Sequence, residues 1–63
     1  MTELERRIKQ LSKKATVAMD EAENEYGYSD FANEGIVYHY AGYLAEEFDL
    51  DIEKAYNLIM GIE

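Results

Sequence analysis

The sequence predicts an all-α fold, a small three-helix domain with a long N-terminal helix, formed by one domain spanning residues 1–63. Apolar side chains recur at spacings of three and four residues, which is the period of an amphipathic helix. Capping and turn residues divide the chain into three such segments, expected at about 2–24, 30–48 and 52–60. The run 36–40 has a strand-like composition, but the helical spacing on both sides of it outweighs that signal.

Segment 2–24 begins with Thr2 and Glu5, whose spacing fits a capping box. Its apolar stripe repeats at alternating intervals of four and three residues and comprises Leu4, Ile8, Leu11, Ala15, Ala18 and Ala22. Such a stripe is typical of a helix that packs lengthwise against another helix. We expect Leu4, Ile8, Leu11 and Ala15 to contact a second copy of the chain.

Charge is distributed unevenly along the chain. Residues 1–14 carry a net charge of +3, and residues 15–63 carry −11. Within the first segment this order opposes the helix macrodipole, which favours acidic residues first. An antiparallel pair of first helices would place the basic half of each opposite the acidic Asp20–Glu25 of the other. We therefore expect a homodimer or a larger helical assembly.

Segment 30–48 follows a short turn, in which Gly27 ends the first helix and Ser29 or Asp30 caps the second. One predicted face is the core face and comprises Val37, Tyr40, Ala41, Leu44 and Phe48. A neighbouring flank, which we expect to join the interface, comprises Ile36, Tyr40 and Tyr43. The far side carries Gly35, His39, Gly42 and Glu46. Two glycines within a helix cost roughly 1 kcal/mol each relative to Ala. They lie seven residues apart on one face, which leaves room for a backbone or a ring to approach closely.

Segment 52–60 is expected to begin after a cap at Asp49 or Asp51 and to end at Gly61. Its expected buried residues are Leu50, Ala55, Leu58, Ile59 and Ile62. Residues 44–59 resemble a helix-turn-helix motif, with Ala45 on the first helix, a turn at Asp49–Leu50, and Ala55 and Leu58 on the second helix. The resemblance implies, as an alternative function, a DNA-binding regulator. Asp49 departs from the Gly favoured in that turn, and Lys54 is the only cation of the would-be reading helix.

Composition excludes several other classes. The chain has no Cys and one His, which removes disulfides, thiolate sites and multi-His sites within one chain. The carboxylates do not follow the spacing of a calcium loop. Neither Ser12 nor Ser29 has a nucleophile context, and His39 lacks a sequence partner for acid–base work. We therefore expect no enzymatic activity, no cofactor and no metal.

The net charge of −8 disfavours binding to nucleic acid and to anionic membranes. No apolar run reaches the roughly 18 residues of a membrane span, and the first residues lack a signal core, so we expect a cytoplasmic protein.

Six Tyr residues exceed what a domain of this size can conceal, and Tyr is favoured at protein interfaces. Besides self-association, we expect that an acidic face binds a larger basic protein, as a DNA mimic would. That face comprises Asp20, Glu21, Glu23, Glu25, Glu46 and Glu47.

Overall fold

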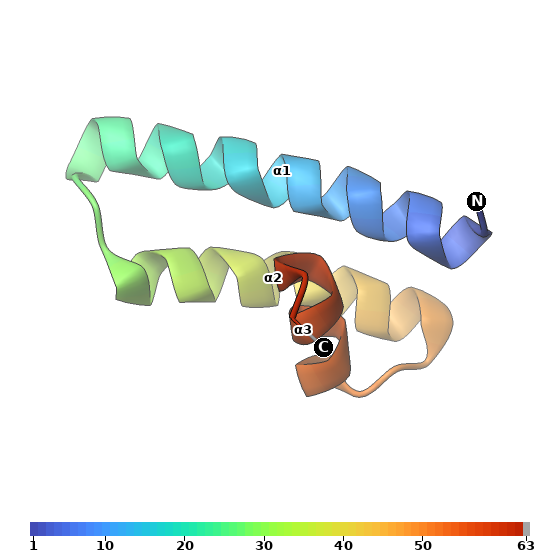
Figure 1. The fold of residues 1–63 in the computed structure, drawn as a ribbon. Helices are drawn as coiled ribbons and strands as arrows, with labels where there is room; N and C mark the ends of the chain where they lie inside the picture. The colour runs from blue at the N-terminus through green and yellow to red at the C-terminus, as the bar shows by residue number, and fades with distance from the viewer. Residues whose placement is uncertain (63) are drawn as a thin grey trace.

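The computed structural model describes residues 1–62 and consists of three α-helices. These are α1 (Glu3–Tyr26), α2 (Asp30–Phe48) and α3 (Ile52–Met60). The predicted all-α, three-helix fold with a long first helix is confirmed; Glu63, the last residue of the predicted domain, lies outside the described part. Helices α1 and α2 form an antiparallel hairpin, and α3 crosses one side of it near the middle (Figure 1).

The ends of the hairpin helices follow local chemistry. The predicted capping box is present: the Thr2 hydroxyl accepts from the Glu5 amide at 3.1 Å, and the Glu5 carboxylate accepts from the Thr2 amide at 2.9 Å. Helix α1 ends two residues later than predicted, where Gly27 adopts a φ of 90° that other residues rarely take. Ser29 caps α2 by accepting from the Ala32 amide at 3.2 Å.

The turn into α3 is made without glycine. Asp49 has a φ of 53°, in the left-handed region, and its amide donates to the Ala45 carbonyl. Asp51 occupies the cap position of α3, although its side chain makes no capping hydrogen bond. At the other end, Gly61 is left-handed, and the Ile62 amide donates to the Asn57 carbonyl at 2.8 Å. This is the Schellman arrangement that commonly closes a helix.

All three helices contribute to one core. Its buried members are Leu11, Val37, Ala41, Leu44, Ala55 and Ile59. Tyr40, Phe48, Leu50 and Leu58 are half-buried against it, close to the sequence prediction. The prediction for Ile62 was wrong: its side chain is 51% exposed, because the left-handed Gly61 takes the chain out of the helix. The Ser12 hydroxyl donates to the Ile59 carbonyl at 3.0 Å and so fastens α3 to α1.

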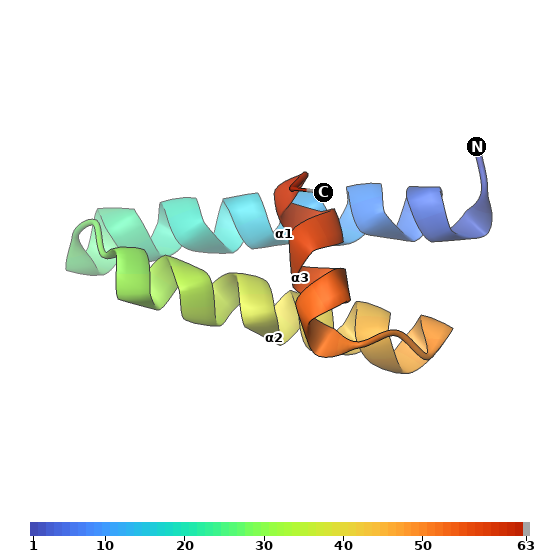
Figure 2. The same ribbon diagram turned by 60° about the horizontal axis from the view of Figure 1, so that its bottom comes forward.

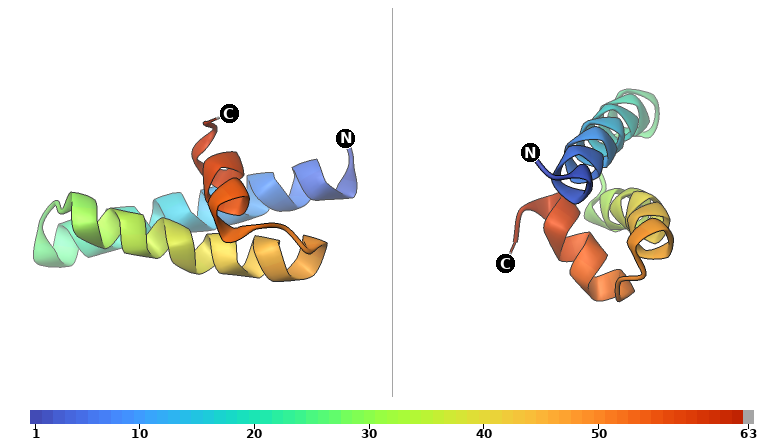
Figure 3. Two further views of the ribbon diagram at one scale, coloured as in Figure 1. Left: turned by 90° about the horizontal axis from the view of Figure 1, so that it is seen from below. Right: turned by 90° about the vertical axis from the view of Figure 1, so that its right-hand side faces the viewer.

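Because α3 has only nine residues, it covers only part of the hairpin. Seen from different directions, it lies on one side of the α1–α2 pair, and the half of the hairpin nearest the α1–α2 turn extends beyond it (Figures 2 and 3). Two surfaces consequently lack a third helix: the side of the hairpin opposite α3, and the turn-end half of the α3 side.

Candidate protein-interaction surfaces

The apolar stripe of α1 is used largely within the chain itself. Leu11 and Ala15 are each 1% exposed, and Leu4 and Ile8 pack half-buried against the core. The short connection folds α2 back along α1, so the stripe meets α2 and α3 of the same chain. In this conformation Leu11 and Ala15 have no surface left for a second copy. The stripe therefore explains the helical hairpin, and Leu11 and Ala15 are not available to a second copy as the sequence led us to expect.

The flank of α2 lies on the opposite side of the hairpin from α3. Tyr40 and Tyr43 are separated by 6.2 Å between ring centroids, and the His39 ring lies 5.2 and 5.1 Å from them, edge-on. Tyr40 and Ile36 are half-buried, whereas Tyr43 and His39 are exposed. Of the expected interface residues, Ile36, Tyr40 and Tyr43 thus remain accessible in part.

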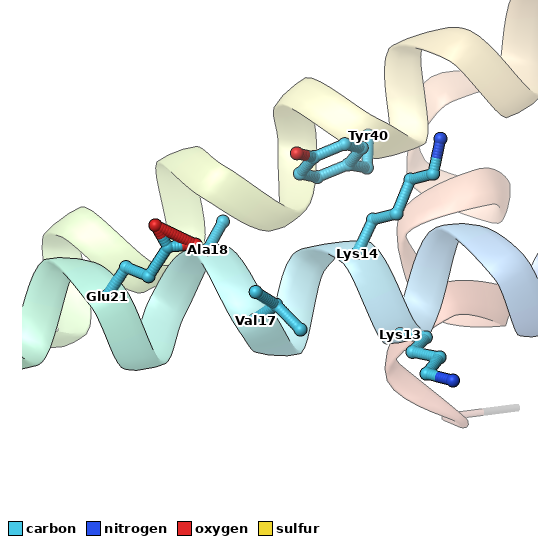
Figure 4. A pocket seen from close by; sticks show the side chains of 6 residues that line it. All are labelled: Lys13, Lys14, Val17, Ala18, Glu21 and Tyr40. Atoms are coloured by element: carbon cyan, nitrogen blue, oxygen red, sulfur yellow. The ribbon is translucent and has the colours of Figure 1, made fainter.

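A shallow groove of about 330 Å³ runs between the two long helices on this side. Val17 and Ala18 of α1 and Tyr40 of α2 line its middle, and Lys14 and Glu21 stand on either side of that middle along α1 (Figure 4). A second hollow of about 320 Å³ continues from Lys14 and Tyr40 towards Arg7 and Tyr43. We call this surface the open face; its residues are Lys13, Lys14, Val17, Ala18, Glu21, Ile36, His39, Tyr40 and Tyr43.

Val17 is the residue that sequence reasoning missed. It is 50% exposed and lies outside the apolar stripe, so the helical period gave no reason to single it out. The available signal was its own spacing: Gln10, Lys14, Val17 and Glu21 also recur at intervals of four, three and four residues. Because Val17 is its only apolar member, this second stripe gives a much weaker signal than the apolar stripe of α1.

The six acidic residues expected to form one face lie at two ends of the hairpin. The group from Asp20 to Glu25 precedes the turn, whereas Glu46 and Glu47 lie at the end of α2, which an antiparallel hairpin places beside the start of α1. Glu47 forms a bidentate ion pair with Arg7, and both nitrogen–oxygen distances are 2.8 Å. The hydrogen bonds from Arg7 lower the pKa of the Glu47 carboxyl and raise the pKa of Arg7.

Aromatic side chains collect at the turn end of the hairpin. Tyr26 is 82% exposed and Phe31 is 89% exposed, and the hydroxyl of exposed Tyr28 donates to the Asp30 carboxylate. That hydrogen bond, together with the charge of Asp30, raises the pKa of Tyr28. The rings are displayed at the surface, as their number led us to expect.

Three other possibilities raised by the sequence were a metal site, a role for the single His, and a membrane span. Among residues 1–62, no group of three potential metal ligands comes together. The exposed His39 has the rings of Tyr40 and Tyr43 as its aromatic neighbours. None of the described helices is long and apolar enough to cross a membrane.

The helix-turn-helix-like segment 44–59 has the expected sharp turn at left-handed Asp49. On its second helix, Tyr56 is stacked on Tyr38 at 4.2 Å, while Glu53 and Lys54 are exposed.

Comparison with family models, with curated proteins and with solved structures gives no match.

Proposed function

We propose that the protein acts by protein–protein contact, without catalysis, and that the open face binds a second copy of the chain. The observation that carries this proposal is the order of side chains along the groove. A small apolar centre, Val17 and Ala18, lies between a cation at Lys14 and a carboxylate at Glu21. Lys14 and Glu21 are about 10 Å apart along the helix axis, at 1.5 Å per residue.

This order is self-complementary in an antiparallel pair. A two-fold axis passing between Val17 and Ala18 brings Lys14 of each copy beside Glu21 of the other. The small central residues let the two α1 helices approach closely, and Tyr40 and Tyr43 add apolar area from α2. A two-fold contact uses the same patch on both subunits, as in most dimers. The sequence-based idea of an antiparallel α1 pairing is retained, on a different stripe of the helix.

The test of contact is a pair of matched substitutions on α1, read by light scattering at micromolar concentration. Val17→Glu places a charge in the centre of the groove, and we expect the mass to fall from about twice to once the chain's 7.3 kDa. Thr16→Glu adds the same charge at the neighbouring exposed position outside the groove, and the dimer should persist. If the two substitutions change the mass equally, the open face is not the surface that binds the second copy.

The register is tested by charge reversal. Lys14→Glu alone and Glu21→Lys alone each set like charges together across the two-fold axis and should weaken the dimer. The double variant restores opposite charges and should recover it. If the double variant does not recover association, the antiparallel register is refuted. The contact surface is tested separately, by comparing Val17→Glu with Thr16→Glu.

DNA binding through residues 44–59 is the second candidate, favoured by the left-handed turn at Asp49 between two crossing helices. The predominantly acidic surface opposes it, because phosphate contacts supply much of the affinity for DNA. A duplex-binding assay at low salt separates the candidates, and a salt-dependent shift of the duplex there would favour the regulator.

A further inference from the structure

A second groove, of about 300 Å³, lies on the α3 side of the hairpin at its turn end. It is lined by the second half of α1, the first half of α2 and the end of α3. The groove exists because α3 crosses the hairpin and leaves the turn-end half without a third helix (Figure 1).

The floor of this groove is apolar and adaptable. Met19 and Met60 contribute flexible thioether side chains, which suit a surface that has to accommodate another helix. Tyr56 forms a firmer wall, because its ring stacks on Tyr38 and the Tyr38 hydroxyl donates to Glu53 at 2.9 Å. That hydrogen bond raises the pKa of Tyr38. The wall is therefore ordered before any partner arrives, which lowers the entropy lost on binding.

The rim of the groove is acidic. Asp30 and Glu34 line it directly, and Glu23 follows Met19 by four residues on the same face of α1, beside the groove. Five of the six basic residues lie within residues 1–14, at the other end of α1. A cleft with walls of one sign attracts ligands of the opposite sign.

We propose that this groove binds a cationic amphipathic α-helix of another protein, with apolar residues on the floor and Lys or Arg side chains on the rim. Helix-in-groove recognition needs an apolar trough with room for a helix alongside it. The α1 segment between Ser12 and Tyr26 offers about 20 Å of length at 1.5 Å per residue. The inference rests on the proposed action through protein contacts, but it uses the side of the hairpin opposite the open face.

The experiment titrates the whole protein with a synthetic Leu/Lys peptide of about 16 residues, with Leu at helical spacing. A peptide with Glu in place of each Lys is the charge control. Binding is followed by calorimetry and by the NMR signals of the Met methyl groups. We expect the cationic peptide to bind and to shift Met19 and Met60, and the anionic peptide not to bind.

Two matched double variants locate the site. Glu23→Gln with Glu34→Gln removes rim charge, and Asp20→Asn with Glu46→Gln removes the same charge from exposed positions outside the groove. The rim variant should lose about fivefold in affinity, as expected for two exposed ion pairs, and the other variant much less. An equal loss in both variants, unshifted Met signals, or no binding of the cationic peptide would overturn the proposal.

The same titration on Val17→Glu separates this proposal from self-association. Because Val17 lies on the open face, the groove should bind the peptide with unchanged affinity whether the protein is a dimer or a monomer. Loss of binding in this variant, with its fold intact by circular dichroism, would place the peptide on the open face and overturn the groove. If the wild-type protein is a monomer and binds the peptide, the proposed dimer is refuted but the proposed groove is not.

Discussion

Replacing both helical glycines of α2 by alanine should stabilise the protein. Gly35 and Gly42 lie inside α2 without positive φ, and a Cβ built at either position meets no atom within 4 Å. Neither glycine is therefore required by packing within the chain. Gly costs about 0.8–1.0 kcal/mol relative to Ala inside a helix, so the two substitutions together should contribute about 2 kcal/mol.

The two sites are about 10 Å apart along the axis, and their effects should add. For a domain of this size, 1 kcal/mol shifts the melting temperature by about 4–8 °C, which predicts a rise of about 8–16 °C. Thermal and urea unfolding followed by circular dichroism measure the gain, in free energy and in Tm. The mass in solution should not change, because neither Gly35 nor Gly42 lines the grooves of the open face.

Gly27→Ala is the control for the same chemical change. Gly27 has φ 90° and ψ 167°, where a Cβ is strained even though space is available, so this variant should lose about 1–3 kcal/mol. If the α2 double variant gains nothing, or loses stability as Gly27→Ala does, then a Cβ at Gly35 and Gly42 does not have the free space inferred for it. A gain in stability accompanied by a lower mass would instead assign the glycine side to the assembly.

Three further predictions concern the core, the α2–α3 turn and the ion pair. Leu44 is fully buried, so Leu44→Ala should lower the free energy of unfolding in urea by about 2–5 kcal/mol, and a loss under 1 kcal/mol would contradict its place in the core. Asp49→Gly should raise the same quantity by about 1 kcal/mol, since glycine takes left-handed φ without strain; a decrease would show that the Asp49 side chain stabilises the turn. Arg7 lowers the pKa of Glu47 below its ordinary 4.5, so this pair stabilises the fold above that value and the contribution is lost as the pH falls through the folded pKa. Glu47→Gln should therefore have a lower free energy of unfolding than the wild type at neutral pH, and the difference should disappear on acidification. Glu46→Gln should show no such pH-dependent loss of stability. A difference between Glu47→Gln and the wild type that does not change with pH would contradict a stabilising Arg7–Glu47 pair.

The helices and the core were accessible from the sequence because local signals agreed with the tertiary fold. Capping residues such as Thr2 and Ser29 and the terminal Gly27 and Gly61 act within one helical turn, so their spacing is sufficient to place the helix ends. The same is true of the α2 core face around Val37, Ala41 and Leu44, which follows from the helical period.

The surfaces were less accessible because they depend on which helix packs where. The α1 stripe predicts that a helix lies against it, but the period does not say whether that helix belongs to the same chain. The crossing of α3, which exposes Val17 on one side and Met19 and Met60 on the other, depends on contacts distant in sequence. The Arg7–Glu47 pair, separated by 40 positions, illustrates the same limit.

Sedimentation equilibrium of the unmodified protein, over a range of concentrations and salt, measures whether two copies of the chain associate. The proposed antiparallel dimer should give a monomer–dimer equilibrium that reaches about twice 7.3 kDa and shifts towards monomer as salt screens the Lys14–Glu21 pairs. A mass of 7.3 kDa at every concentration, from a protein that is folded by circular dichroism, would contradict it.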